Sequence, residues 1–170
     1  MRSRAPVVCI VAPGSGYGKT ALIDSLLAGL KQQGIKACVL KHSGHDFEPD
    51  VEKDTWFFRQ AGAIGSAVIT EAGLASFYVP CSTLESSLAI LEGLEPDIIL
   101  CEGFKESNLP KILLLKAEDE FGIIPSLTSV LAVVYDSEYP EWVKVPVLKQ
   151  AKEVLNFLLD YHRRSKEGLV

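Results

Sequence analysis

The sequence lacks the features that mark membrane-spanning proteins, secreted proteins and nucleic-acid binders. None of its apolar runs approaches the ~18 residues of a membrane-spanning helix, and its first residues contain no readable secretory signal. Its 17 basic and 22 acidic side chains give a formal charge of −5, whereas neutralising nucleic-acid phosphates requires a basic face. We therefore expect a cytoplasmic protein with neither a membrane nor a nucleic acid as its partner.

Cysteine is also scarce, and its spacing excludes two further classes. No two of the four cysteines form a Cys-x-x-Cys pair, so the spacing of a zinc finger is missing. Three of them, Cys9, Cys38 and Cys101, lie inside apolar runs. We expect small buried thiols in a reducing cytoplasm rather than a disulfide framework.

Length and composition predict a single globular domain over residues 1–170. Apolar residues make up 48% of the chain and charged residues 23%, as in folded proteins. The 170 residues are close to the ~150 of one ordinary domain. Neither an internal repeat nor a low-complexity linker interrupts the sequence.

Short β-branched runs alternate with amphipathic segments along the chain. The apolar run Val7–Val11 is typical of a strand covered on both faces. Apolar residues at three- and four-residue spacing predict a helix over Thr20–Gln33, and a strand at Ile35–Leu40 would complete a unit that builds parallel sheets. Two β-prone segments, Ala67–Thr70 and Ser76–Val79, flank Glu71–Gly73 and predict a hairpin. These patterns predict an α/β fold with a mainly parallel central sheet and an additional β-hairpin.

The remaining elements are predicted from local signals. Ser82 and Glu85 have the spacing of a capping box, which predicts a helix from there to about Leu94. Asp54 is the predicted N-cap of a short helix ending near Gly62. Further strands are expected at Asp97–Cys101, Lys111–Leu115 and Val130–Tyr135, and a closing helix at Lys149–Arg164.

A glycine-rich segment joins the first predicted strand to the first predicted helix, and it reads Gly14-Ser15-Gly16-Tyr17-Gly18-Lys19-Thr20. Unpaired amides at a helix N-terminus attract anions, and glycines let the backbone curl around a phosphate. Lys19 would reach the terminal phosphates and the Thr20 hydroxyl would bind Mg²⁺, as in a Walker A loop. Nucleotide contacts are expected from Gly14 through Ala21. The full pattern has a glycine where this chain has Pro13, and an ordinary glycine-rich turn is the alternative.

Glu102 is the carboxylate that we expect beside the metal ion. It ends the apolar strand that begins at Asp97, and a carboxylate at such a strand end can hold the nucleotide's Mg²⁺ in phosphate-loop folds. Mg²⁺ keeps several waters, so one hydroxyl and one or two carboxylates suffice. A solvated glutamate is the alternative.

Four motifs, in order, resemble the molybdopterin-guanine dinucleotide biosynthesis protein B family (MobB). After the phosphate loop come Leu40-Lys41-His42-Ser43-Gly44-His45-Asp46-Phe47, Lys53-Asp54-Thr55-Trp56 with Arg59-Gln60-Ala61-Gly62-Ala63, and Glu102-Gly103-Phe104-Lys105. The likeness runs from about Val7 to Pro146. Glu52 stands where the family usually has a glycine. The resemblance implies a three-layer P-loop NTPase-like fold.

The resemblance also implies a function. It implies a GTP-binding homodimer with at most weak Mg²⁺-dependent GTPase activity, which assists the guanylyltransferase that attaches GMP to molybdopterin. Molybdopterin or its carrier protein is a further possible partner. By motif, Lys19 and Thr20 hold phosphate and Mg²⁺, and Asp54 and Glu102 line the same site. Lys41, His42, His45 and Asp46 follow the second strand, where ligands bind in open α/β sheets.

Two cations are candidates for the charge that develops during phosphoryl transfer, Arg59 and Lys105. Arg59 is the only arginine away from the chain ends, and a surface ion pair is its alternative role. His42 and His45 could be metal ligands, polar substrate contacts or parts of a solvated loop. The chain has no Asn-Lys-x-Asp sequence, so the expected preference for guanine depends on the resemblance alone.

Two other functions are compatible with the residues. A phosphate loop serves many chemistries, so the chain could be a P-loop kinase or an ATP-dependent ligase acting on a small metabolite. It could also be an interaction module whose loop is vestigial, with the hairpin pairing to a partner's strand. Nucleotide turnover with a small acceptor, or partner binding without nucleotide, would distinguish these two hypotheses.

Overall fold

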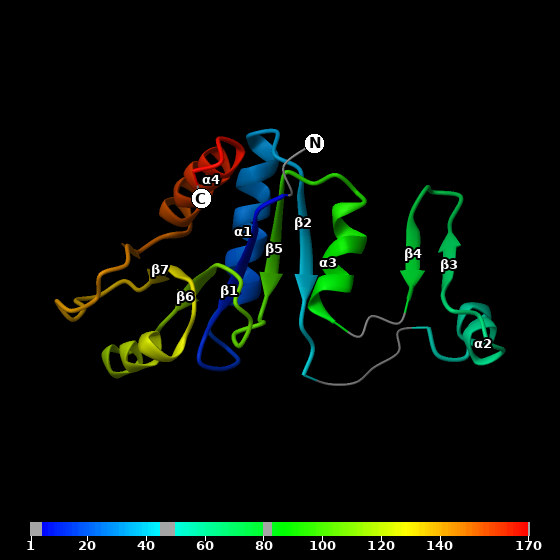
Figure 1. The fold of residues 1–170 in the computed structure, drawn as a ribbon, viewed down its shortest axis with the longest axis horizontal. Helices are drawn as coiled ribbons and strands as arrows, with labels where there is room; N and C mark the ends of the chain where they lie inside the picture. The colour runs from blue at the N-terminus through cyan, green and yellow to red at the C-terminus, as the bar shows by residue number, and fades with distance from the viewer. Residues whose placement is uncertain (1–4, 45–49, 80–82, 170) are drawn as a thin grey trace. The chain divides into compact units, whose positions relative to one another are not determined.

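The computed structural model describes residues 5–44, 50–79 and 83–169 (Figure 1). The chain packs as two compact units, one formed by residues 1–42 with 90–170 and the other by residues 43–89. This division into packing units does not test the prediction of one domain over residues 1–170. His45, Asp46, Cys81 and Ser82 lie outside the described residues.

The first unit contains a six-stranded parallel sheet in the order β2-β5-β1-β6-β7-β8. Most of its strands are short apolar runs, and those of β1, β5 and β6 are buried almost throughout. The predicted mainly parallel sheet is therefore confirmed. Its strands are β1 (Val7–Val11), β2 (Ala37–Lys41), β5 (Ile98–Glu102), β6 (Lys111–Leu114), β7 (Val130–Val134) and β8 (Val147–Leu148).

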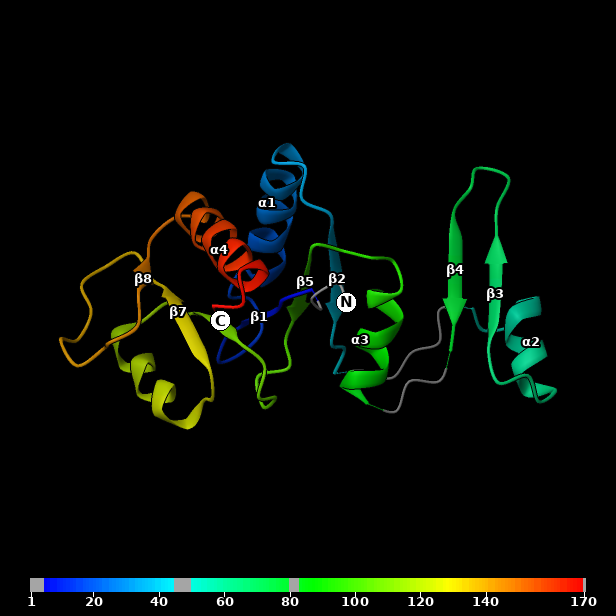
Figure 2. The same cartoon turned by 45° about the horizontal axis from the view of Figure 1, so that its top comes forward.

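Two helices, α1 (Lys19–Gln32) and α4 (Ala151–Lys166), cover one face of this sheet (Figure 1). Their apolar residues recur at helical spacing and meet alternate residues of the strands. The shared core is made by Val8, Ile10, Leu22, Ile23, Leu26, Leu30, Ile98, Leu100, Ile112, Leu114, Ala132, Val154 and Leu158, together with Ala12. Figure 2 shows α1 and α4 as neighbours, and their shared core holds α1 against the sheet.

A 3₁₀ helix, η1 (Glu118–Ser126), connects β6 to β7. Sequence periodicity did not predict it, and it also did not predict the two-residue strand β8. Phe121 of η1 is buried, and its ring meets the Tyr135 ring edge-on at 5.0 Å between centroids. This contact anchors the segment that follows β6.

The second unit contains α2 (Asp54–Gln60) and an antiparallel hairpin of β3 (Ser66–Ile69) and β4 (Ala75–Tyr78). The predicted hairpin is therefore confirmed, with strands that begin and end one residue earlier. Its turn has Gly73 at φ 80°, a left-handed conformation that glycine adopts without strain. Helix α3 (Leu84–Glu92) begins in this unit and ends in the other.

The predicted N-cap of α2 differs in the structure, whereas Ser82 of the predicted capping box lies outside the described residues. Asp54 is the first residue of α2, and Lys53 is its N-cap. At α3 the Ser86 amide donates to the Thr83 hydroxyl at 3.1 Å, and the Thr83 amide lies 3.3 Å from the Ser86 hydroxyl. Serine can therefore take the position that glutamate occupies in the sequence pattern. Among the described residues, no helix is long and apolar enough to cross a membrane.

Candidate functional site at the opening of the first helix

The phosphate loop joins β1 to α1 with its backbone open to solvent. Gly16 and Gly18 have φ of 77° and 83°, so the loop makes two left-handed turns that favour glycine. Gly18 is the N-cap of α1 and has no side chain to cover the first amides of the helix. Gly14, Ser15 and Thr20 are also exposed. A helix start of this kind can accept an anion.

Lys19 lies along the loop. Its ammonium Nζ donates to the Gly14 carbonyl at 2.8 Å, which brings a positive charge to the loop that carries the exposed amides. The loop therefore carries exposed amides of a helix start beside a cation, and that these groups bind phosphate stays a prediction. Pro13 does not prevent this arrangement, because the left-handed turns occur later, at Gly16 and Gly18.

Glu102 and Thr20 meet beside the loop. The Thr20 hydroxyl donates to the Glu102 carboxylate at 3.1 Å, because α1 begins next to the strand end that carries the glutamate. The parallel ladders set Glu102 in register with Ile10 of β1 and with Lys41 of β2. Neighbouring parallel strands thus bring together groups that are separate in sequence.

The donor set of this pair suits Mg²⁺. A threonine hydroxyl and a carboxylate are hard oxygen ligands, and Mg²⁺ takes its other ligands from water and phosphate. The Lys41 ammonium lies 3.3 and 3.4 Å from the two Glu102 oxygens and balances the charge of this largely buried carboxylate. In the described part of the chain, no three His, Cys, Asp or Glu side chains gather as a ready-made metal cage.

The segments after β2 and after β5 touch each other. The His42 amide donates to the Glu102 carbonyl at 3.0 Å, and the rings of His42 and Phe104 lie 5.1 Å apart between centroids. Gly103 has φ 96°, and a Cβ on it would lie 3.2 Å from His42 Cβ. Two of the sequence motifs therefore form one surface. Lys105 forms an ion pair with the exposed Glu106 at 3.8 Å.

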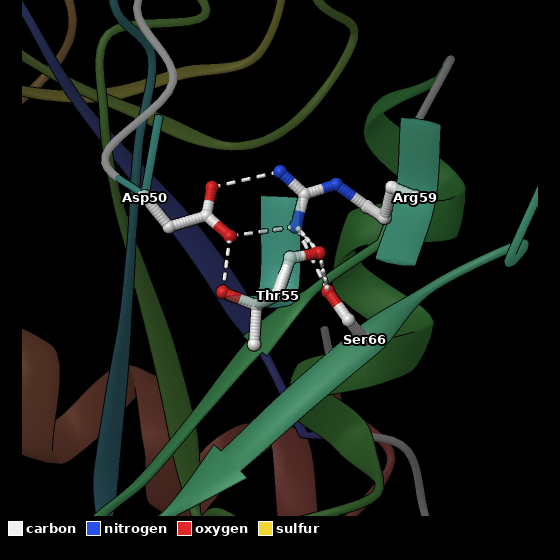
Figure 3. Close-up of polar contacts among 4 residues, drawn as sticks. All are labelled: Asp50, Thr55, Arg59 and Ser66. Carbon is white, nitrogen blue, oxygen red and sulfur yellow. Dashed lines mark hydrogen bonds and ion pairs between the residues drawn. The ribbon is translucent and has the colours of Figure 1, made fainter. Parts of the chain in front are cut away.

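In the second unit, Arg59 belongs to a buried polar network (Figure 3). Its guanidinium donates to both Asp50 oxygens at 2.8 and 2.7 Å and to the Ser66 hydroxyl at 2.8 Å. The Thr55 hydroxyl donates to Asp50 at 2.6 Å, and the Tyr78 ring lies under the guanidinium at 5.2 Å. The network joins α2 to both hairpin strands. Arg59 thus pairs with an acid, but the pair is buried rather than on the surface.

The electrostatics of this network follow from its geometry. The hydrogen bond from Arg59, helped by the one from Thr55, holds the pKa of Asp50 down at about 2. Asp50 therefore stays ionised and fixes the guanidinium. Just after it, Glu52 has φ 61°, a conformation that glycine adopts more easily.

Lys111 is a buried cation on the segment that follows Glu102, and its role was not predicted from the sequence. The residue is fully buried in β6, and its ammonium donates to the carbonyls of Ser107, Leu109 and Thr128. Burial lowers the pKa of this ammonium. Lys111 thereby holds the segment that follows Glu102. A lysine inside an apolar strand was the available signal, because such a residue needs buried acceptors.

The phosphate loop has a second set of partners on η1 and the residues before it. The Lys116 ammonium donates to the Gly16 carbonyl at 2.8 Å, and the Tyr17 hydroxyl donates to the Glu120 carboxylate. That carboxylate raises the pKa of Tyr17, and the Lys116 amide, with Tyr17, lowers the pKa of Glu120. Sequence reasoning named Tyr17 only as part of the loop and missed both partners.

Comparison with known proteins identifies the family. The sequence profile described as "Molybdopterin guanine dinucleotide synthesis protein B" matches residues 7–136. This chain belongs to the MobB family. The match spans the phosphate loop, the motif after β2, α2 and the Glu102 motif, so the predicted resemblance is confirmed.

Related proteins support the MobB assignment. The molybdopterin-guanine dinucleotide biosynthesis adapter protein of Haemophilus influenzae is 33% identical over 122 residues, which is 69% of this chain and 67% of that protein. A relative from Methanocaldococcus jannaschii is 31% identical over 144 residues, 82% of this chain. The chain spans only 60% of the length of that relative.

The fold also matches a solved MobB structure. The MobB homologue of Bacillus stearothermophilus superposes with a TM-score of 0.71 and 24% identity, over 92% of this chain and 97% of that one. The predicted P-loop NTPase-like architecture with its extra hairpin is therefore the fold of MobB proteins.

Within the MobB chain, the structure brings together Lys19, Thr20, Lys41 and Glu102, with His42 adjacent. Asp54 and Arg59 belong to the other unit, so their predicted roles beside the nucleotide stay predictions. His45 and Asp46 are outside the described residues. Lys105 faces Glu106, and its catalytic role also stays a prediction.

Proposed function

We propose that this MobB protein is a GTP-binding adapter in the cytoplasm, which assists the guanylyltransferase that attaches GMP to molybdopterin. The observation that carries the nucleotide part is the contact between Thr20 and Glu102 beside the glycine loop. A hydroxyl and a carboxylate meet there at a helix start that also carries the ammonium of Lys19. Its family and the adapter role of its relatives support the pathway.

The loop residues have separate tasks in this proposal. The amides of Gly14 to Thr20 bind the phosphate oxygens, and the Lys19 ammonium exchanges the Gly14 carbonyl for a terminal phosphate. Thr20 and Glu102 would supply two oxygen ligands for the Mg²⁺ that accompanies the triphosphate. When bound, Mg²⁺ screens the phosphate charge. Lys41 neutralises Glu102 when the metal has not yet arrived.

Slow hydrolysis agrees with the geometry. Phosphoryl transfer needs a cation at the developing charge and a group that orients the attacking water. The Arg59 guanidinium is bound to Asp50 and Ser66, whereas the Lys105 ammonium forms an ion pair at 3.8 Å with the exposed Glu106. Moving Arg59 would leave the buried Asp50 without its main partner. We therefore propose nucleotide binding with weak turnover rather than a rapid GTPase.

A homodimer is the proposed assembly, and the exposed apolar side chains of the β3–β4 hairpin in the second unit support it. Ile69, Leu74 and Phe77 are 75%, 72% and 66% exposed. A two-stranded hairpin is marginally stable by itself, and exposed apolar side chains of this size mark interaction sites. Replacing Phe77 with lysine should therefore shift the protein from dimer to monomer in sedimentation velocity. A wild-type protein that sediments as a monomer at high concentration would contradict the assembly.

The nucleotide site is tested by calorimetry with GTP, ATP and GDP, with and without Mg²⁺. Lys19→Ala should weaken Mg²⁺-dependent GTP binding by about 10- to 100-fold, because charged hydrogen bonds contribute about 1.5–3 kcal/mol. Lys31→Ala, in the last turn of the same helix, is the matched control. It removes the same charge away from the loop and should bind like the wild type.

Two outcomes would contradict the proposal. Equal GTP affinity in Lys19→Ala and the wild type, with the fold intact by circular dichroism, would remove Lys19 from the site. Rapid ATP turnover with a small-metabolite acceptor, and none of GTP, would instead favour the kinase or ligase.

A further inference from the structure

The phosphate loop is held from outside by the segment that follows β6. Lys116 directly follows the last buried residues of that strand region, and Glu120 belongs to the first turn of η1. Their partners on the loop, Gly16 and Tyr17, are about 100 residues away in sequence, with separations of 100 and 103. Sheet order explains the meeting, because β6 lies next to β1.

The carboxylate of Glu120 is also held by backbone amides of its own segment. The amides of Lys116 and Ala117 donate to its Oε2 at 2.7 and 3.2 Å. An acceptor fixed by two backbone amides can hold the Tyr17 hydroxyl in one place. The Lys116 ammonium also lies 5.2 Å from the centroid of the Tyr17 ring, so ring and hydroxyl are both engaged.

The contact between Lys116 and Gly16 orients the next amide. A trans peptide is planar, and its C=O and N–H point in opposite directions. Because the Gly16 carbonyl is turned to Lys116 at 2.8 Å, the Tyr17 N–H points to the other side of the peptide, away from Lys116. The glycine at φ 77° allows that orientation. The ammonium thus selects one of the two ways in which this peptide could face.

We propose that Lys116, Glu120 and Tyr17 are positioning residues that hold the phosphate loop in its binding conformation before the nucleotide arrives, with the Tyr17 amide presented to a phosphate. The role rests on the proposed GTP binding. A loop ordered in advance loses less conformational freedom when ligand binds, so these residues contribute affinity without touching the nucleoside. The ligand class they serve is an Mg²⁺-bound di- or triphosphate.

Electrostatics alone makes the opposite prediction for one variant. Glu120→Ala removes a negative charge near the phosphates, which by charge alone should tighten anion binding. Loss of positioning should weaken it. Tyr17→Phe removes only the hydroxyl contact and changes no charge at neutral pH. Lys116→Gln removes the cation that holds Gly16, and Lys31→Gln makes the same charge change at the far end of α1.

The test measures Mg²⁺-pyrophosphate and Mg²⁺-GTP binding by calorimetry. We expect Lys116→Gln and Glu120→Ala to weaken both ligands by a similar factor, about 5- to 10-fold, which is the upper part of the range for one ordinary hydrogen bond, because neither group touches the ligand itself. Tyr17→Phe should weaken both by about 3-fold, and Lys31→Gln should match the wild type. Without ligand, the ¹⁵N–¹H signal of Tyr17 should shift in Lys116→Gln and stay in place in Lys31→Gln.

Four results would overturn this role. The first is tighter binding by Glu120→Ala, and the second is a loss of GTP affinity in Lys116→Gln while its pyrophosphate affinity is unchanged. The third is wild-type affinity in Lys116→Gln, Glu120→Ala and Tyr17→Phe alike. The fourth is a Tyr17 signal that does not move in Lys116→Gln. A wild-type protein that binds neither ligand would overturn the proposed function together with this role. Wild-type binding with unaffected variants would overturn the positioning role alone.

Discussion

Gly29 faces Leu155 where α1 meets α4. Gly29→Ala adds one methyl group at this contact, and we expect it to destabilise the protein when Leu155 is present and to stabilise it when Leu155 is replaced by alanine. A Cβ at Gly29 would overlap Leu155 Cδ2 and lie 3.1 Å from its Cδ1 and 3.2 Å from its Cγ. Gly29 is buried in the interior of α1. This close approach supports the helix that carries the phosphate loop.

Two opposing contributions set the magnitude. Glycine to alanine in a helix interior stabilises by about 1 kcal/mol, from helix propensity. Forcing an extra methyl group into a packed contact costs about 1–3 kcal/mol. For Gly29→Ala alone we expect a net destabilisation of about 1 kcal/mol, because the overlap involves the branch point of Leu155 as well as its flexible end.

The sign should reverse once the leucine is truncated. In the Leu155→Ala background the overlapping atoms are gone, so Gly29→Ala should stabilise by about 1 kcal/mol through propensity alone. The coupling between the two positions is then about 2 kcal/mol, within the range measured for residues in contact.

Urea denaturation, followed by circular dichroism in the absence of nucleotide, measures the free energy of unfolding of the wild type, Gly29→Ala, Leu155→Ala and the double variant. Ala28→Gly is the matched control, because Ala28 is exposed on the same helix and should cost about 1 kcal/mol by propensity. Equal stabilisation by Gly29→Ala with and without Leu155 would refute the reasoning, since it would mean that no steric conflict exists between α1 and α4.

Three further predictions concern groups around the sites. Because Arg59 lowers the pKa of Asp50 to about 2, the stability that this carboxylate contributes is present above pH about 4 and lost as pH falls toward about 2; NMR titration should show this, and a midpoint near 4 in the wild type would contradict it. Burial lowers the pKa of Lys111, so the unfolded chain binds the proton more tightly and wild-type stability should rise as pH approaches about 10; urea titrations of Lys111→Met should lack this contribution. Gly103→Ala should destabilise by about 1–3 kcal/mol because of its φ of 96° and its contact with His42; thermal denaturation that matches the wild type would exclude that strain.

Local patterns predicted that the glycine loop joins the first strand to the first helix and that Glu102 ends a strand, and the structure has both there. That they bind phosphate and metal stays a prediction. Gly16 and Gly18 take the left-handed turns that a curled loop requires. Thr20 begins α1 and Glu102 ends β5, and the two meet because β5 pairs with β1, the strand that precedes α1. Such features depend on residues close in sequence and on one rule of parallel sheets, that carboxyl ends lie at one edge.

The partners of polar residues were not predictable from local patterns. Lys116 and Glu120 lie in a segment without helical periodicity, and Asp50 lies in a polar stretch that reads as a loop. Each found its partner through packing: Glu120 with Tyr17, and Asp50 with Arg59. A buried charged side chain needs a polar partner. The sequence shows that the charged residue is there, but it does not show which residue will be its partner.

The sequence by itself determined the alternation of strands and helices, the parallel sheet and the glycine loop, because these follow from the spacing of apolar residues and from glycine's backbone freedom. The likeness of its motifs to those of the MobB family, which no spacing rule supplies, indicated the family. Only the tertiary structure decided that Lys111 is buried against three carbonyls, that Arg59 is bound within the hairpin unit, and that Lys116 holds the loop. Strand order places segments far apart in the chain within hydrogen-bond distance, and no local spacing encodes which of them meet.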